Sequence, residues 1–131
     1  MSLIDSSAWI ELFRGTGSRT HRQLRKQISS AEEMATTEPV AMELLAGARS
    51  ARDRRRIKGA LAACRMVSVH NAGDWEDAAA IYLSCRRAGA TPRRLLDCLI
   101  AAIAIRAGIP VLAADRDYEL ISRHTALELV E

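Results

Sequence analysis

The chain has 131 residues, a length that suits one domain over residues 1–131. Apolar residues make up 49 % of it and the net charge is +3, so it can form a substantial core and is only mildly basic. It has no run of about 18 apolar residues to cross a bilayer and no signal-peptide pattern at its start. Its three cysteines lack CxxC spacing and its three histidines lack an HxxxH pair, which argues against a zinc site. We therefore expect a cytoplasmic protein with reduced thiols and no membrane association.

Short apolar segments alternate with longer amphipathic ones along the whole chain. Glycine and proline separate them, as Gly15, Pro39 and Gly108 do at helix boundaries. In chain order, the first half predicts a strand at 2–5, a helix at 8–14 capped by Ser6 and Ser7, a helix at 19–29, a strand at 34–37, and helices at 39–46 and 51–64.

The second half continues the alternation. The helix at 94–107 is apolar most of the way round, so it is expected to be central and buried. Strands that alternate with helices predict an α/β fold, with a parallel or mostly parallel sheet covered by helices on both faces. The elements of this half are a strand at 66–69, helices at 74–88 and 94–107, a strand at 110–113, a short helix at 118–122 and a last strand at 126–130.

Acidic residues end or interrupt the apolar segments. Asp5 follows the first strand, and Asp115 and Asp117 follow the fourth. Asp97 opens the most apolar helix, and Glu43 lies among apolar neighbours in another helix. In a parallel sheet, sites form beyond the carboxyl ends of the strands, where winding would gather these acids.

Each acid also has an ordinary explanation. Asp5 and Asp115 could cap the helices that follow them. The dipole at a helix start favours Asp97, and Glu43 could pair with an arginine. Clustered carboxylates, however, repel one another unless a cation lies between them. Mg²⁺, with Mn²⁺ as an alternative, suits an all-oxygen site, so the set predicts metal-assisted phosphodiester chemistry.

Arginines carry almost all of the positive charge and lie in three groups. The groups within residues 19–26 and 49–58 are explained as solvated helix faces. The third group lies just before Asp97, so its guanidiniums are candidates to bind a phosphate backbone. It consists of Arg86, Arg87, Arg93 and Arg94.

Four segments together resemble the motifs of PIN-domain ribonucleases, specifically the VapC toxins of VapBC toxin–antitoxin pairs. They come in the family's order and span nearly the whole chain. Two departures are Ala113, where the family often has Thr, and Tyr118, where it often has Phe; neither removes an acid. The segments are LIDSSAWI at 3–10, PVAMELLAG at 39–47, DCLIAA at 97–102 and LAADRDY at 112–118.

The resemblance implies a mostly parallel five-stranded sheet and an endoribonuclease that depends on Mg²⁺ or Mn²⁺ and cuts tRNA or ribosomal RNA. It implies a homodimer silenced by a cognate VapB antitoxin, whose C-terminal tail covers the site. Ser7 would orient the first carboxylate. The implied catalytic acids are Asp5, Glu43, Asp97 and Asp115, and the implied metal ligands are Asp5, Asp97, Asp115 and Asp117.

Two other classes of protein compete with this interpretation. A phosphoacceptor receiver domain needs an acceptor aspartate after the third strand and a lysine late in the chain. Here that strand ends in Val69, His70 and Asn71, and the last lysine is Lys58. A catalytically degenerate PIN-like module that acts through a protein partner is the alternative that stays open, although the intact set of acids argues against it.

Overall fold

A computed structural model describes residues 1–131, which form one parallel sheet surrounded by helices. The connections between strands all pass through helices, as parallel pairing requires. The α/β fold predicted from the sequence is therefore confirmed. The sheet has the strand order β3-β2-β1-β4 and consists of β1 (Ser2–Ile4), β2 (Met34–Thr36), β3 (Arg65–Met66) and β4 (Val111–Leu112).

The prediction of five strands is wrong. The C-terminal segment pairs with β4 only at an isolated parallel bridge between Leu129 and Val111. Two hydrogen bonds make this bridge, from Val111 N to Glu128 O and from Val130 N to Val111 O, each 3.0 Å long. Because β4 has only two residues, it offers the tail too short an edge for a full strand.

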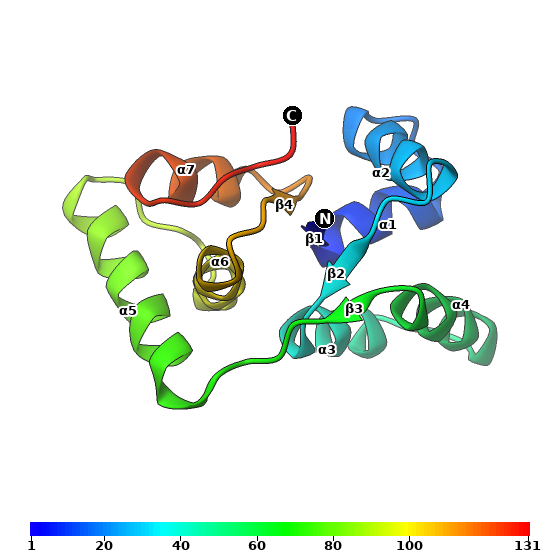
Figure 1. The fold of residues 1–131 in the computed structure, drawn as a ribbon, viewed down its shortest axis with the longest axis horizontal. Coiled ribbons are helices and arrows are strands. Elements are labelled where there is room, and N and C mark those ends of the chain that lie inside the picture. Colours follow the sequence, from blue (N-terminus) through cyan, green and yellow to red (C-terminus); the bar gives the residue numbers. More distant parts are fainter.

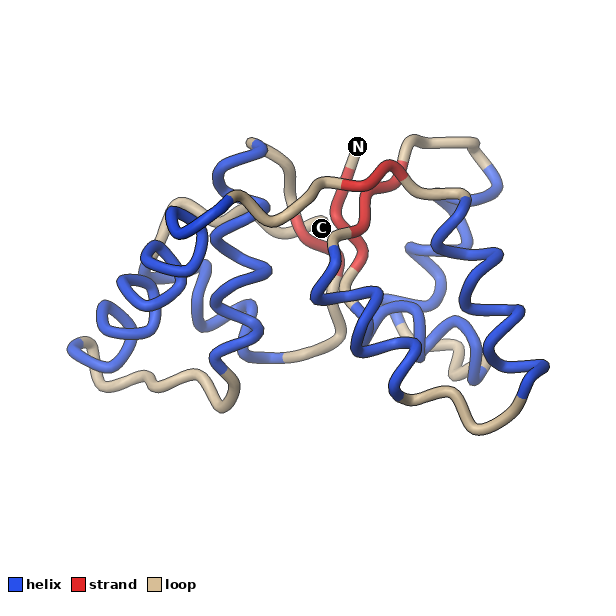
Figure 2. Tube along the Cα trace, turned by 90° about the horizontal axis from the view of Figure 1, so that it is seen from below, coloured by secondary structure: helices blue, strands red, loops and turns tan.

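Seven helices surround the sheet. Figure 1 shows α5, α6 and α7 on one side and α1, α2 and α4 on the other, and Figure 2 shows the strands between two groups of helices. None of the helices is both long and apolar enough to cross a membrane. Their bounds are α1 (Ser6–Arg14), α2 (Arg19–Ser29), α3 (Glu38–Ala46), α4 (Ala51–Ala62), α5 (Asn71–Arg87), α6 (Leu95–Ala107) and α7 (Arg116–His124).

The central helix is α6, as its sequence predicts. Every residue from 97 to 104 is buried, and the helix packs against α3, α5 and α7. The strands β1 and β2 are buried throughout, so the sheet and α6 share one aliphatic core. Because Asp97 lies in the first turn of this buried helix, the core itself fixes the position of the carboxylate.

Two predictions about single elements are only partly correct. The strand expected at 66–69 is a two-residue edge strand whose residues are exposed. The spacing in α5 predicts an inner face of Trp75, Ala78, Ala79 and Tyr82. Of these only Ala78 is buried, Trp75 is 58 % exposed, and Ile81 and Cys85 face the core instead. The helix has apolar residues on several faces, so spacing alone did not identify the buried one.

Candidate metal centre

Asp5 directly follows the end of β1 and is the first acid of the site. It is the N-cap of α1, so Asp5 rather than Ser6 or Ser7 caps this helix. Its Oδ2 accepts hydrogen bonds from the backbone N of Ser7, at 3.0 Å, and from the Ser7 hydroxyl. Its Oδ1 accepts a hydrogen bond from the Tyr118 hydroxyl at 2.8 Å. Protein donors therefore hold both oxygens of a fully buried carboxylate.

The two serines after Asp5 connect α1 to other parts of the site. Ser7 Oγ accepts a hydrogen bond from the backbone N of Ala114 at 2.9 Å, which joins the start of α1 to the turn after β4. Ser6 Oγ donates a hydrogen bond to Oε1 of Glu43, on α3, at 3.2 Å. These two serine contacts link α1 to α3 and to the turn that carries Asp115.

Asp97 has the most unusual environment of the predicted acids. It is fully buried, and its Oδ1 accepts a hydrogen bond from Arg94 at 2.9 Å. Its Oδ2 is buried without any hydrogen-bond partner. Burial raises the pKa of Asp97 to about 7; Arg94 lowers that pKa, while the nearby charges of Asp5 and Asp115 raise it further. A buried carboxylate oxygen with no partner is the kind of group that a cation satisfies.

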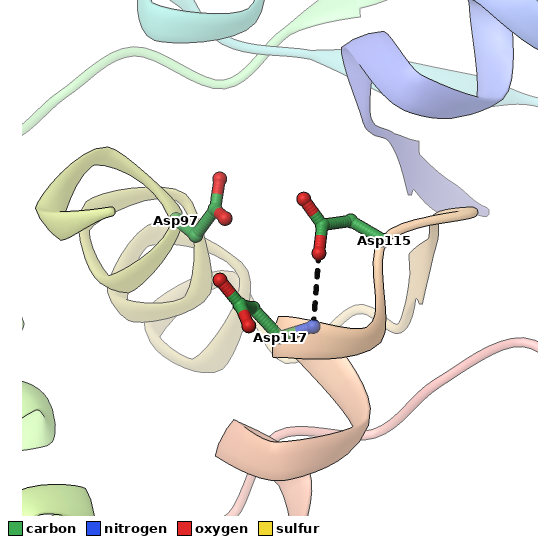
Figure 3. Close-up of side chains that lie close together, drawn as sticks. All are labelled: Asp97, Asp115 and Asp117. Carbon is green, nitrogen blue, oxygen red and sulfur yellow. Dashed lines mark hydrogen bonds between the residues drawn. The ribbon is translucent and has the colours of Figure 1, made fainter. Parts of the chain in front are cut away.

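The acids of α7 complete this arrangement. Asp115 is the N-cap of the helix, and its Oδ1 accepts a hydrogen bond from Asp117 N at 2.9 Å (Figure 3). One carboxylate oxygen from each of Asp97, Asp115 and Asp117 lies within 4.8 Å of the other two. Figure 3 shows the three side chains converging from α6 and from the start of α7. Three clustered carboxylates fit a hard divalent cation such as Mg²⁺ or Mn²⁺.

Two arginines contact these acids. The guanidinium of Arg94 lies 2.8 Å from Glu43 and 2.9 Å from Asp97. The guanidinium of Arg93 lies 2.9 Å from Asp115 and 3.4 Å from Asp117. Burial lowers the pKa of Arg94, but Asp97 and Glu43 raise it by more, so this guanidinium stays charged.

The structure brings most of the predicted site residues together, and Asp5 and Glu43 lie at the border of the three-acid group. Asp5 connects to Asp97 through Tyr118, and Glu43 connects to it through Arg94. Arg86 and Arg87 lie apart, at the end of α5, and neither forms an ion pair with the acids. The guanidinium of Arg86 instead lies over the ring of Tyr82, at 6.0 Å.

Tyr118 is a site residue that sequence reasoning missed. As a replacement for Phe, Tyr118 is predicted to keep the packing and add a polar tip, but its hydroxyl lies between Asp5 and Asp97, at 2.8 and 3.5 Å. Burial, with the charge of Asp5, raises the pKa of Tyr118 well above its ordinary value, so the hydroxyl stays a donor. The available signal was its position one residue after Asp117, in a segment rich in acids.

Comparison with known proteins agrees with this geometry. The model of the PIN-domain family matches residues 2–124. The chain therefore belongs to the PIN-domain family. It is of the VapC type within that family: it is 42 % identical over 129 residues to Ribonuclease VapC11 of Mycobacterium tuberculosis, covering 98 % of this chain and 96 % of the relative. VapC ribonuclease Mb1587 of Mycobacterium bovis matches with the same identity and coverage.

Solved structures share the fold. One is VapBC2 from Rickettsia felis, bound to a DNA fragment from its promoter. It superposes with a TM-score of 0.75 at 14 % identity, and the superposition covers 98 % of this chain and 96 % of the Rickettsia felis chain. VapC20 from Mycobacterium tuberculosis superposes with a TM-score of 0.69 at 20 % identity and covers 94 % of each chain. These likenesses show that the chain shares its arrangement of sheet and helices with these solved VapBC and VapC structures.

Proposed function

We propose that the protein is a metal-dependent endoribonuclease that acts as the toxin of a VapBC-type pair. The observation that carries this proposal is the group of three carboxylates within 4.8 Å of one another, one of which, Asp97, has a buried oxygen with no partner. Such a group suits a divalent cation, and 42 % identity to proteins named VapC ribonucleases supports the assignment to RNA cleavage.

Asp97, Asp115 and Asp117 would hold the cation, with Asp5 beside them. When bound, Mg²⁺ or Mn²⁺ would supply charge that activates water and neutralises the phosphate. Asp5 has used three of its four acceptor positions on Ser7 and Tyr118, so one acceptor position on Oδ1 is left for the cation.

The remaining assigned residues would shape the acidic site. Glu43 extends the acidic lining from α3, where Ser6 and Arg94 hold its carboxylate. Ser7 fixes the position of Asp5 relative to the turn after β4, because its hydroxyl contacts both.

The substrate we propose is structured RNA, either tRNA or ribosomal RNA. The side chains of Arg93 and Arg94 are 70 % and 46 % exposed beside the acids, so both can reach backbone phosphates. Arg86 and Arg87 would extend this contact along the end of α5. VapC20, which shares the fold, is described as a toxin that cleaves the sarcin–ricin loop, and this supports an RNA of that class.

The proposed partner is a cognate VapB-type antitoxin that covers the acids. Solved relatives from Salmonella typhimurium and Mycobacterium tuberculosis are VapBC complexes, which supports such a pairing. We also propose a homodimer in the cytoplasm. The three free cysteines fit a reducing compartment.

The test is a cleavage assay on total tRNA and ribosomal RNA. Wild type, Asp97→Asn and Asp77→Asn are compared in Mg²⁺ and in EDTA. Asp77 is an exposed aspartate on α5, so its substitution removes the same charge away from the site. We expect discrete fragments from wild type and Asp77→Asn in Mg²⁺ only, and a loss of at least about 100-fold in Asp97→Asn.

Two results would contradict the proposal. Equal cleavage by Asp97→Asn would show that the acid cluster does not carry the reaction. No cleavage by a folded wild type that also fails to bind Mn²⁺ would favour the alternative, a catalytically degenerate PIN-like module that acts through a protein partner.

A further inference from the structure

We propose that Arg94 is a built-in counter-ion, which a divalent cation displaces from the acid cluster and which then binds the RNA backbone. The displacement concerns the protein and the cation alone. The transfer of Arg94 to RNA rests on the proposed ribonuclease function.

Arg94 binds where a cation would bind. Its guanidinium reaches acids from three elements: Glu43 on α3 at 2.8 Å, Asp97 on α6 at 2.9 Å and Asp115 at the start of α7 at 3.9 Å. Asp97 and Asp115 are also two of the three acids whose oxygens cluster within 4.8 Å. The guanidinium and a divalent cation therefore compete for the same carboxylates.

The acids are fixed, whereas the guanidinium is free to leave. Asp97 is fully buried, and Asp115 is only 15 % exposed and caps α7. The side chain of Arg94 is 46 % exposed and makes no capping hydrogen bond to α6. An exposed, flexible side chain can change rotamer without disturbing the core, so exchange requires Arg94 to move and the acids to stay in place.

The backbone keeps a displaced Arg94 close to the site. The backbone N of Arg93 donates a 2.9 Å hydrogen bond to Oδ2 of Asp117. This bond holds the segment before α6 against α7, independently of either guanidinium. After displacement, the Arg94 side chain would thus remain beside the acids and face the solvent, where a phosphate would approach.

Charge balance favours the exchange. Five carboxylates face only two guanidiniums, those of Arg93 and Arg94, so the site keeps an excess of negative charge. A compact divalent cation neutralises more of this charge than a delocalised guanidinium does. The planar fork of arginine, in turn, matches the oxygens of a phosphate. Metal binding and RNA binding should therefore strengthen each other, and to the same extent in both directions.

The first test measures Mn²⁺ binding to the metal-free protein by isothermal titration calorimetry, without RNA. Wild type, Arg94→Gln and Arg116→Gln are compared. Arg116 is an exposed neighbour of Asp115 that forms no ion pair with the acids, so it is a matched control for charge alone. We expect Arg94→Gln to bind Mn²⁺ about 10-fold tighter than wild type, and Arg116→Gln to stay within about 2-fold.

Three results of this test have defined meanings. Affinity of Arg94→Gln equal to or weaker than that of wild type would overturn the exchange. Equal tightening by both variants would also overturn it, because general charge would then be the cause. If circular dichroism shows that Arg94→Gln is unfolded, Arg94→Lys keeps the charge but lacks the bidentate fork, and we expect it to bind Mn²⁺ several-fold tighter than wild type.

The second test measures the transfer of Arg94 to RNA. Binding of a labelled RNA is compared in Ca²⁺ and in EDTA, with gels to verify that the RNA stays intact. We expect Ca²⁺ to raise wild-type affinity by about 5-fold or more and to raise that of Arg94→Gln much less. An equal rise in both would overturn the transfer to RNA. The Mn²⁺ result stands apart from this test, so failure of the ribonuclease proposal and failure of the exchange are distinguishable.

Discussion

The hydroxyl of Tyr118 donates a 2.8 Å hydrogen bond to Oδ1 of Asp5 and lies 3.5 Å from Oδ1 of Asp97. One buried side chain from α7 thus lies against carboxylates from the end of β1 and the start of α6. Because burial keeps the hydroxyl protonated, it supplies a neutral donor between two acids that repel each other. Tyr118 is therefore part of what allows these acids to share a buried space.

We expect Tyr118→Phe to fold and to lose about 1.5–3 kcal/mol in free energy of unfolding, the usual contribution of a hydrogen bond to a charged group. Urea denaturation in EDTA measures the loss. Tyr82→Phe is the control, because the Tyr82 hydroxyl makes no hydrogen bond and is only half-buried. Equal stability of Tyr118→Phe and wild type would mean that the contact contributes nothing.

The pH dependence of stability should identify Asp97. Burial raises its pKa from 3.8 to about 7, against the opposing effect of Arg94. A raised pKa in the folded state means that this group's contribution to stability is complete below about pH 4 and is lost as the pH rises to about 7. In EDTA at pH 8, Asp97→Asn should therefore exceed wild type in free energy of unfolding by roughly 1–3 kcal/mol.

The difference in free energy of unfolding between Asp97→Asn and wild type should shrink at pH 5, where wild-type Asp97 is mostly protonated. Denaturation at both pH values measures this change, and a difference that does not vary with pH would contradict the assigned pKa. Excess Mn²⁺ at pH 8 should raise the stability of wild type and leave Asp97→Asn nearly unchanged, because a cation that binds only the folded state stabilises it.

Ser7→Ala should weaken cation binding while every acid remains. The Ser7 hydroxyl contacts Oδ2 of Asp5 and the backbone N of Ala114, so its loss removes one of the three hydrogen bonds that hold the Asp5 carboxylate and releases the turn before Asp115. We expect affinity for Mn²⁺ to fall about 10-fold, as for other partners that orient metal ligands. Calorimetry measures this affinity against that of Ser122→Ala, because Ser122 is a half-buried serine whose hydroxyl bonds only within α7.

The ion pair between Arg106 and the buried Asp74 should affect stability but not the metal centre. Arg106 on α6 donates two hydrogen bonds to Asp74 on α5, at 2.9 and 3.0 Å, and a third to Ser68 O at 2.8 Å. His70 N also donates to Asp74, at 2.7 Å. Asp74→Asn leaves Arg106 without its charged partner, so we expect a loss of about 3 kcal/mol in unfolding free energy.

The same pair gives a pH prediction with the opposite sign to that of Asp97. The hydrogen bond from Arg106 lowers the pKa of Asp74, so its contribution to stability is present above about pH 4 and disappears as the pH falls. Affinity for Mn²⁺ should be the same in Asp74→Asn and wild type. A change in affinity would mean that the far end of α6 affects the metal centre.

Much of the fold could be predicted because it depends on local patterns. Alternating apolar and amphipathic segments predicted all seven helices and the four strands of the sheet, with bounds that differ mostly at the ends. The position of Asp5 and Asp115 just after parallel strands predicted that they meet at one edge. The helix-capping roles considered for these two residues also proved correct, and capping is compatible with their place in the site.

The sequence by itself determined which elements form and which carboxylates gather, because periodicity and strand ends are local properties of the chain. Only the tertiary structure decided that Arg93 and Arg94 bind the acids while Arg86 and Arg87 do not, and that Tyr118 joins Asp5 to Asp97. The tertiary structure also shows that the segment expected to form the last strand makes only a single bridge, between Leu129 and Val111. These contacts join side chains far apart in the chain, and their geometry depends on how whole helices pack against the sheet, which a local pattern does not encode.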